Sequence, residues 1–461
     1  MASLFGYCVF QEVAMASAPQ SRAADNVDRS ALPEPVRMGK LSLTMAWWAV
    51  CSAVFYIVVG ASLALTYGAV NAIIGMALSV VSYGLINSVI SRFAIRSGLS
   101  VAQFSRRLFG RMGASLATLI FFSTAIYYAV FEGSVIAFAI NHLFPGVVYW
   151  AAAALVVLYS VPLIFGSVQH WLDKFNGVLL PFYLLGLLAT IVVSVMHYGY
   201  QANWLQYGPA NPSPWGWWNC FTYYMGVWVL MMYTFDYARF GREEDSKYHA
   251  RFNFGMPFYL VTFFLNGVAG IYLASSLRDA GALSETAVVV AILNLLGIAG
   301  LGFVWVTQTR INTANYYLAT VNMQVFFHSL FNLKLPKLVW ACVVGGVVYI
   351  LMLADVFAWL LQALAYQGVF VVAWVGVALA GIAHNVPPDH EHVAINPVGV
   401  GAWFISVALG IVLMHGPASF AAFSAVATFV SACGLYTLFS QWARVSVNKL
   451  PKPRRPASVR R

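Results

Sequence analysis

Charged residues are scarce in this sequence: Asp, Glu, Lys and Arg make up 9% of its 461 residues, whereas 61% are hydrophobic. The mean hydropathy is +0.77, and a soluble domain of this length needs a far more polar surface to stay dispersed. The 5 cysteines are scattered without paired spacing, which argues against a disulfide framework or a cysteine-bound metal. The apolar segments carry no nucleophile–base pair and no metal-ligand array. We therefore expect no enzymatic activity, no metal and no cofactor.

Long apolar runs recur along the whole chain instead, and many are long enough to cross a lipid bilayer. Backbone polar groups in lipid must be hydrogen-bonded within their own segment, so these runs are expected to be helices. We predict an all-α integral inner-membrane protein of about twelve spans, with a short helix at 284–294 on the outer face. The predicted spans are 42–67, 70–93, 112–141, 148–166, 176–197, 214–235, 254–275, 297–322, 338–354, 356–382, 400–415 and 417–439.

The net charge of +10 would suit a nucleic-acid-binding protein, but the placement of the basic residues argues against nucleic acid as a partner. With twelve spans, 23 of the 25 Lys and Arg residues fall at the termini and in connections on one side. Only Arg278 falls in an opposite-side loop, and Arg310 lies within a span. The positive-inside rule makes the basic side cytoplasmic, with both termini inside. The basic tail is then expected to meet anionic lipid head groups of the bilayer.

Two predicted spans carry helix-breaking residues in their middle. The first contains Gly60, within Val-Gly-Ala-Ser, and the sixth contains Gly226, within Tyr-Tyr-Met-Gly. They lie five spans apart, as expected for an inverted repeat in which each broken helix lines a central site. Close packing of membrane helices would explain the same glycines without any function.

Ionisable side chains inside a bilayer are costly and are candidates for function. Glu132 lies deep in the third span, shortly after Tyr127 and Tyr128. Tyr128 and Glu132 are four residues apart and share one helix face. Together they offer a flat ring for stacking and a hydrogen-bonding carboxylate, which suits a planar polar heterocycle.

The eighth span has a second cluster of polar residues. Gln308, Asn312 and Asn315 follow helical spacing and form an amide-rich stripe. Arg310 points to a different face of the same helix. A purely structural alternative is that the amides join helices to one another and that Glu132 and Arg310 neutralise each other.

Two motifs resemble those of the nucleobase:cation symporter-1 family, the cytosine, purine and hydantoin permeases, and particularly its bacterial cytosine permease branch. Phe235-Asp236-Tyr237-Ala238-Arg239-Phe240-Gly241-Arg242 resembles the family's Asp-aromatic-x-Arg-aromatic signature after the sixth span. Arg106-Arg107-Leu108-Phe109-Gly110 resembles its Arg-x-x-Phe-Gly element. The resemblance covers about residues 38–382.

This resemblance implies the leucine-transporter-type fold of five plus five spans with two extra helices, and a flat base held between the first, third, sixth and eighth spans. Where the cytosine branch has Gln and Trp in the third span, this chain has Tyr127 and Tyr128 nearby. Where sodium-coupled members have two hydroxyl residues in the eighth span, it has Thr309 and Arg310. The expected chain divisions are 1–37 (disordered, cytoplasmic), 38–440 (membrane domain; repeats 38–197 and 214–382, extra helices 400–439) and 441–461 (basic cytoplasmic tail).

The sequence therefore predicts a symporter that imports a nucleobase or related heterocycle together with a cation, a proton rather than sodium. We expect Trp228, in the sixth span, to join the third- and eighth-span residues in binding, although aromatics there more often face lipid or core. Glu132, Thr309 and Arg310 are the predicted ion-coupling residues. An amino-acid or amine transporter and a uniporter remain alternatives. The spans show no continuous polar stripe of the kind that a channel needs.

The predicted topology can be tested by labelling introduced cysteines in intact cells. A cysteine at Ala280 should react with an impermeant reagent because it lies in an outer loop. A cysteine at Ser446 should react only after the cells are permeabilised. The reverse pattern would contradict both the orientation and the number of spans.

Overall fold

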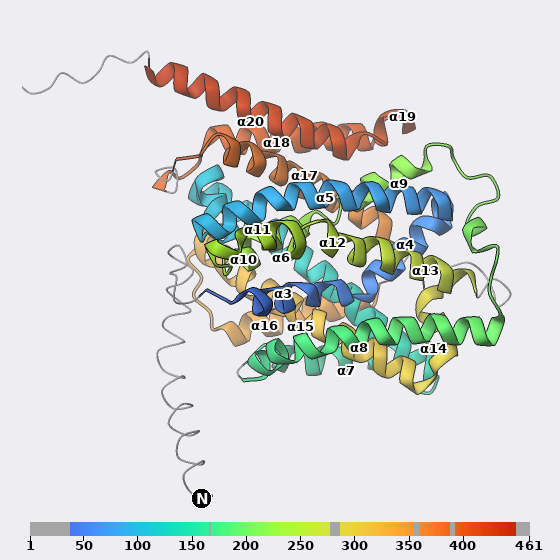
Figure 1. Ribbon diagram of the computed structural model, residues 1–461. Helices are drawn as coiled ribbons and strands as arrows, with labels where there is room; N and C mark the ends of the chain where they lie inside the picture. The colour runs from blue at the N-terminus through green and yellow to red at the C-terminus, as the bar shows by residue number, and fades with distance from the viewer. Residues whose placement is uncertain (1–36, 166, 277–285, 355–358, 388–391, 449–461) are drawn as a thin grey trace, which may run out of the picture.

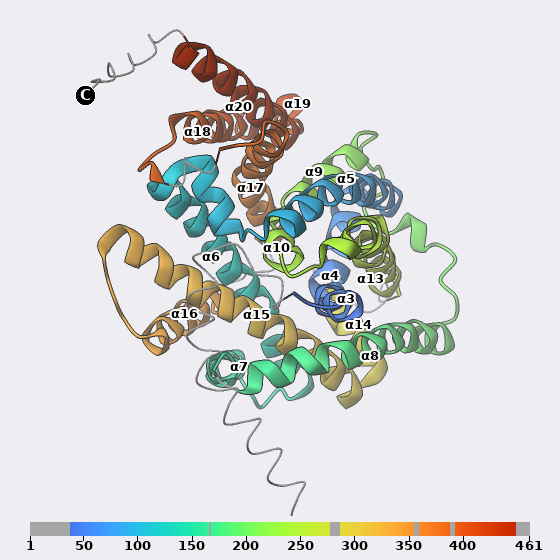
Figure 2. The ribbon, with the colours of Figure 1, turned by 60° about the vertical axis from the view of Figure 1, so that its left-hand side comes forward.

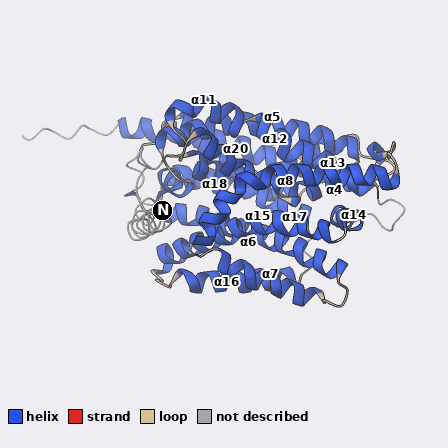
Figure 3. Ribbon diagram, turned by 60° about the horizontal axis from the view of Figure 1, so that its bottom comes forward, coloured by secondary structure: helices blue, strands red, loops and turns tan. Residues whose placement is uncertain are grey.

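The computed structural model describes residues 37–165, 167–276, 286–354, 359–387 and 392–448. Within these ranges the chain is helical apart from short connections and one isolated β-bridge between Met38 and Gly241 (Figure 3). The long helices lie roughly side by side, and α3 begins at the same end of the bundle at which α20 ends (Figure 1). Most of the two predicted terminal segments falls outside the described residues.

The described helices follow one another with short connections. The first half of the chain forms α3 (Lys40–Trp48), η2 (Ala49–Ser52), α4 (Val54–Tyr67), α5 (Ala69–Ser97), α6 (Val101–Leu143), α7 (Tyr149–Leu163), α8 (Ser167–Tyr198) and η3 (Trp204–Gln206). The middle forms α9 (Gly216–Met225), α10 (Val229–Ala238), η4 (Glu243–Asp245), α11 (Ser246–Tyr248), η5 (His249–Asn253), α12 (Met256–Tyr259), η6 (Leu260–Leu265) and α13 (Asn266–Ser275). The last part forms α14 (Ala287–Leu296), α15 (Ile298–Phe331), α16 (Lys337–Met352), α17 (Leu360–Ala383), α18 (Pro397–Met414), α19 (Ala418–Ala421) and α20 (Ser424–Asn448).

Each of the twelve predicted segments coincides with a helix or with neighbouring helix pieces. By length and composition, however, only 6 of the described helices could cross a membrane, or up to 7 if the bent pair α3–η2 and α4 is one span. The difference has a physical cause in the remaining helices. Helices α7 and α16 are short, and α9 and α10 are two halves of a broken segment. Helix α15 is continuous, but its polar residues make it less apolar. The count of twelve spans stays a prediction for these elements.

Helix α6 bends sharply at Gly110, which has φ 77° and ψ 178°. This region of backbone space favours glycine, and a Cβ at Gly110 would lie 2.7 Å from the Val393 carbonyl oxygen. The backbone N–H groups of Arg111 and Met112, released at the bend, donate to the carbonyls of Val393 and Ala394, both at 2.9 Å. The Arg-x-x-Phe-Gly element therefore forms a bend, and the predicted third span corresponds to the second arm of α6.

The first predicted span is interrupted at a different place from the one that the glycine suggested. Its helices α3–η2 and α4 meet at Ala53, where the chain bends by 42°. Gly60 lies inside α4, fully helical and buried. The sequence interpretation of Gly60 as a helix break is thus corrected. A Cβ there would overlap the backbone of Gly267 in α13, so Gly60 allows two helices to approach closely.

The described helices gather into two groups with few contacts between them. One group contains α6, α7, α15 and α16, of which α6 and α15 share the most extensive interface in the structure. The other contains α4, α5, α9, α10, α12 and α13, and α17 packs against members of both (Figure 2). The extra helices α18 and α20 pack mainly on α17 and on each other. The two groups face one another where α4 and α10 meet α6 and α15.

Replacing Gly60 with Ala should destabilise the folded protein by about 1–3 kcal/mol, because the added methyl meets backbone atoms that no rotamer change can move. Gly302→Ala in α15 is the matched control, since a Cβ at that helical position has no neighbour within 4 Å. Thermal unfolding of the two purified variants checks this. Equal melting temperatures would contradict the close contact between α4 and α13.

Candidate functional site

The centre of the two facing groups is lined by residues of α4, α6, α15 and α17. Tyr128 of α6 meets the Phe55 ring of α4 edge-on, with 5.0 Å between ring centroids and an interplanar angle of 87°. Phe55 makes a similar contact with Phe131, at 5.1 Å. Tyr127 lies beside Tyr128 but is less buried, with its ring 5.5 Å away. These rings form an aromatic wall in which Tyr128 belongs to the interior.

Glu132 is 1% exposed and lies one helical turn beyond Tyr128. Its Oε2 atom has no hydrogen-bond partner among the described residues. Tyr56, Tyr127, Tyr128 and Tyr183 all lie within electrostatic range of its carboxyl group. A buried carboxyl without a paired cation is expensive to keep. Such a group is the kind that a ligand or a proton would satisfy.

The amide stripe of α15 divides into two parts. Gln308 is fully buried, and its Oε1 accepts a 3.0 Å hydrogen bond from the backbone N–H of Val54 at the start of α4. Asn312 is also fully buried, but neither its Oδ1 nor its Nδ2 has a partner in the described structure. The Nδ2 of Asn315, 7% exposed, is likewise unpartnered. The structure therefore gives the Gln308 Oε1 a backbone partner, whereas the Gln308 Nε2, both amide atoms of Asn312 and the Asn315 Nδ2 remain without one in the described structure.

Arg310 and Glu132 make no ion pair with each other, although both are described and both are buried. Arg310 instead lies within electrostatic range of Cys51, beside the bend between α3 and α4, and of Tyr237. Its neighbour Thr309 shares a 2.7 Å hydrogen bond with the Tyr159 hydroxyl of α7. The alternative in which Glu132 and Arg310 neutralise each other has no support in this geometry.

The second broken segment is the turn between α9 and α10. Helix α9 ends at Met225, and α17 presses against Gly226, where a Cβ would overlap the carbonyl of Leu364. The Nε2 of Gln367 donates to the Gly226 carbonyl at 3.0 Å and approaches the Tyr128 hydroxyl at 3.5 Å. Gln367 thus brings a carboxamide from α17 next to the Tyr128 hydroxyl.

Trp228 follows the same turn but lies away from the α6–α15 residues. Its ring meets Tyr83 of α5 at 6.1 Å and Phe429 of α20 at 5.1 Å, both edge-on. It is 2% exposed, and its Nε1 has no hydrogen-bond partner among the described residues. The structure thus brings Tyr128, Glu132, Asn312 and Asn315 onto the two helices with the largest shared interface and sets Trp228 apart from them.

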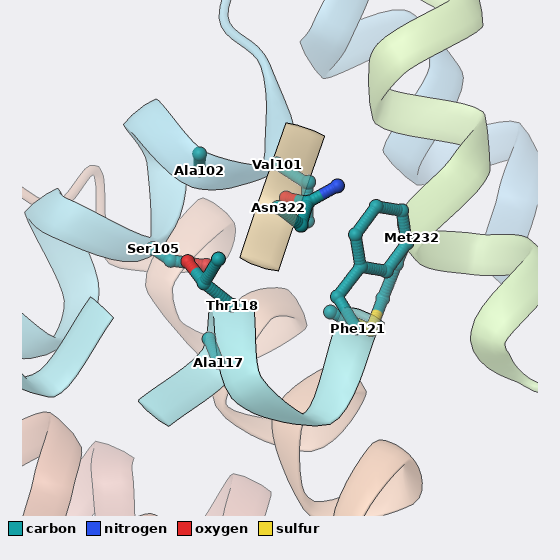
Figure 4. Close-up of a pocket in the computed structure, with 8 residues that line it drawn as sticks. All are labelled: Val101, Ala102, Ser105, Ala117, Thr118, Phe121, Met232 and Asn322. Atoms are coloured by element: carbon teal, nitrogen blue, oxygen red, sulfur yellow. The ribbon is translucent and has the colours of Figure 1, made fainter. Parts of the chain in front are cut away.

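A small cavity lies between the two arms of α6 and the helices α10 and α15 (Figure 4). It has room for about one water molecule. Figure 4 shows its lining side chains, which come from both arms of α6, from α10 and from α15. Its lining residues are Val101, Ala102, Ser105, Ala117, Thr118, Phe121, Met232 and Asn322. Phe121 lies about 10 Å along α6 from Tyr128, so this cavity is separate from the polar residues described above.

Sequence reasoning missed Gln367, Asn266 and Phe55 as neighbours of these residues. Gln367 stands alone in an apolar helix, and a lone glutamine in a span is a weak signal by itself. Asn266 bonds to the backbone of Cys51 across more than 200 residues of sequence. No local pattern could have indicated either contact.

The sequence matches no protein-family model and no curated protein. The structure, however, is similar to several solved ones. The inward-facing conformation of Mhp1 is 15% identical with a TM-score of 0.73, covering 90% of this chain and 93% of that one. Mhp1 in a closed conformation with bromovinylhydantoin bound, described as a nucleobase-cation-symport-1 family transporter, is 13% identical with a TM-score of 0.71, covering 91% and 96%.

Two further structures share the fold more distantly. A Na+-coupled sialic acid symporter is 13% identical with a TM-score of 0.61, covering 91% of this chain and 92% of that one. A mutant manganese transporter of Eremococcus coleocola is 13% identical with a TM-score of 0.54, covering 89% and 96%. This protein is therefore a multi-pass membrane protein with the leucine-transporter-type fold. The structural relatives are transporters rather than enzymes, and at such low identity they show the fold alone.

Asn312 and Asn266 are both buried, but only the Asn266 amide is hydrogen-bonded, and this difference allows a test of the site. Asn312→Leu should leave the melting temperature unchanged or raise it, because it removes polar atoms that have no partner. Asn266→Leu is the matched comparison and should lower it, since the Asn266 amide is fully hydrogen-bonded. Thermal unfolding without added solute measures both. A loss in Asn312→Leu as large as in Asn266→Leu would make Asn312 a structural residue.

Proposed function

We propose that this protein is a secondary transporter that imports a nucleobase or related planar heterocycle by alternating access. The observation that carries the proposal is the set of buried, unpartnered polar atoms on Glu132, Asn312 and Asn315. Because unpaired polar atoms in an interior are costly, a chain retains them where a ligand completes their bonds. A heterocycle edge with alternating donors and acceptors matches a carboxyl group and two carboxamides.

The aromatic residues support a flat ligand. Tyr128 holds its ring in the interior against Phe55, and a planar heterocycle would gain stacking energy on an aromatic ring of this kind. Gln367 adds a carboxamide next to the Tyr128 hydroxyl, which would compensate for the glutamine that the cytosine permease branch carries in its third span. In this proposal Tyr128 and Gln367 contact the ring, and Tyr127 borders the site. Trp228 and Gln308 then have supporting roles through Tyr83, Phe429 and Val54.

The arrangement of the helices supports alternating access. The two helix groups meet across few contacts, so one group can tilt against the other without disturbing its own interior.

Glu132 also favours a second candidate function. A buried carboxylate without a cation would pair with the ammonium group of an amino acid or amine.

In this proposal both termini lie on the cytoplasmic side, as the distribution of basic residues predicts.

For the coupling ion, we propose a proton rather than sodium. A sodium site needs oxygen ligands around the ion. Arg310 lies within electrostatic range of Cys51, just before the interruption at Ala53, where a cation between the first and eighth spans would sit. Its guanidinium does not lose its proton in proteins and supplies a permanent positive charge there. A coupling proton then needs a titratable group, and Glu132 is the buried carboxyl in this part of the chain.

Counterflow in proteoliposomes tests the substrate class. Vesicles loaded with unlabelled cytosine, uracil or hydantoin should accumulate the labelled compound, whereas amino-acid-loaded vesicles should not. Asn312→Ala should weaken the binding of the accepted compound roughly tenfold or more, because two ligand bonds are lost. Gln324→Ala is the control on the same helix, since its carboxamide bonds to the Leu335 carbonyl. Counterflow of amino acids instead of bases would favour the second candidate function.

Replacing sodium with choline tests the coupling ion. Uptake should continue in choline and should rise when the outside is made acidic, because Glu132 would carry the proton inward. Glu132→Gln, which keeps the shape of the side chain, should abolish the response to the pH gradient while exchange continues. A strict sodium requirement would contradict the role of Arg310. Uptake that ignores both sodium and pH would indicate a uniporter.

A further inference from the structure

The bend between α3 and α4 releases two backbone groups that a continuous helix would pair. The chain turns by 42° at Ala53, with Cys51 before the bend and Val54 after it, both fully buried. In an unbroken helix the Cys51 carbonyl and the Val54 N–H would take part in the helical hydrogen-bond pattern. In a membrane interior, side chains must replace those bonds.

Asn266 of α13 supplies the partner for the carbonyl. Its Nδ2 donates to the Cys51 carbonyl at 2.7 Å and to the Thr262 carbonyl at 3.2 Å. Carbonyl oxygens only accept, so the NH₂ end of the amide must face them, and its Oδ1 must face away. That Oδ1 accepts a 2.9 Å hydrogen bond from the Tyr183 hydroxyl of α8. Tyr183 therefore fixes the amide in the orientation that holds Cys51.

Gln308 of α15 supplies the partner for the N–H on the other side of the bend. Tyr183 also reaches α15, because its ring stacks on Phe303 with 5.7 Å between centroids and an interplanar angle of 12°. The bend is thus held by α13 on one side and α15 on the other, and α8 contacts both.

We propose that Tyr183, Asn266 and Gln308 form a hinge clamp that sets the position of α3 relative to α4. Helix α3 packs against α8, so a shift of α8 breaks the Tyr183–Asn266 bond and frees the Asn266 amide to rotate away from Cys51. The clamp then opens and α3 tilts about Ala53. Tyr183 is a positioning residue in this scheme: it acts through Asn266 and touches backbone and side chains of this chain only.

Cys51 itself reports the state of the clamp. It is fully buried in the closed arrangement, so its reaction with a maleimide measures how often the hinge opens. The experiment uses the full-length purified protein with Cys8, Cys220, Cys342 and Cys433 replaced by Ser. Tyr183→Phe, which removes one hydroxyl, should speed the labelling of Cys51 about tenfold. Asn266→Ala should speed it at least as much.

A double-variant comparison separates the clamp from general loosening. If Tyr183 acts through Asn266, then Tyr183→Phe should change nothing further in a chain that already carries Asn266→Ala. Where Asn266→Ala does not yield folded protein, Asn266→Ser replaces it in the same comparison. Ser424→Ala is the control, because it removes a buried 2.7 Å hydroxyl bond to the Gly410 carbonyl between α18 and α20.

Two results would overturn the proposal. One is a Cys51 labelling rate in Tyr183→Phe no faster than in Ser424→Ala. The other is an undiminished effect of Tyr183→Phe in the Asn266→Ala chain, which would make the two residues independent. The measurement follows a thiol reaction rather than transport. Its outcome therefore does not depend on whether the substrate is a nucleobase.

Discussion

The interior of this protein is organised by the need to pair backbone groups wherever a helix is interrupted in an apolar environment. Water cannot bond to a free carbonyl or N–H there, so each interruption needs a partner from another part of the chain. The bend at Ala53 uses the carboxamides of Asn266 and Gln308. The bend of α6 at Gly110 uses the carbonyls of Val393 and Ala394. Each solution joins parts of the chain that are distant in sequence: α13 and α15 to the bend at Ala53, and the connection before α18 to α6.

At the turn after α9, the backbone groups are also paired, but most of their partners lie only three residues earlier in the chain. The N–H groups of Gly226 and Val227 bond to carbonyls three residues earlier, at 2.9 and 3.0 Å, and Gln367 donates to the Gly226 carbonyl. Only a glycine allows α17 to approach this closely, because any side chain would collide with Leu364. Backbone pairing at this turn therefore also delivers Gln367 to the Tyr128 hydroxyl.

Hydrogen bonding separates the buried polar residues into two kinds. Asn266 and Tyr183 have partners that hold the bend, so their bonds are complete within the chain. Gln308 accepts the Val54 N–H through its Oε1, but its Nε2 has no partner among the described residues. Glu132 and Asn312 are equally buried but have atoms without partners. Residues with partnered polar atoms stabilise the fold. Residues with unpartnered polar atoms lower its stability, and a binding site would explain why they are retained. Within the amide stripe of α15, Gln308 has one bonded and one unpartnered polar atom, whereas neither amide atom of Asn312 has a partner among the described residues.

The sequence by itself determined the membrane class, the helical segments and the polar residues of α6 and α15. Hydropathy and helical periodicity are local properties, and they can be read from neighbouring residues. Tertiary structure alone decided that α3 and α4 part at Ala53 while Gly60 packs on Gly267, and that Gln308 has a backbone partner while Asn312 has none. A glycine looks the same in sequence whether it breaks a helix or admits a neighbouring one. Its role depends on the helix that packs against it, and that helix comes from the other half of the chain.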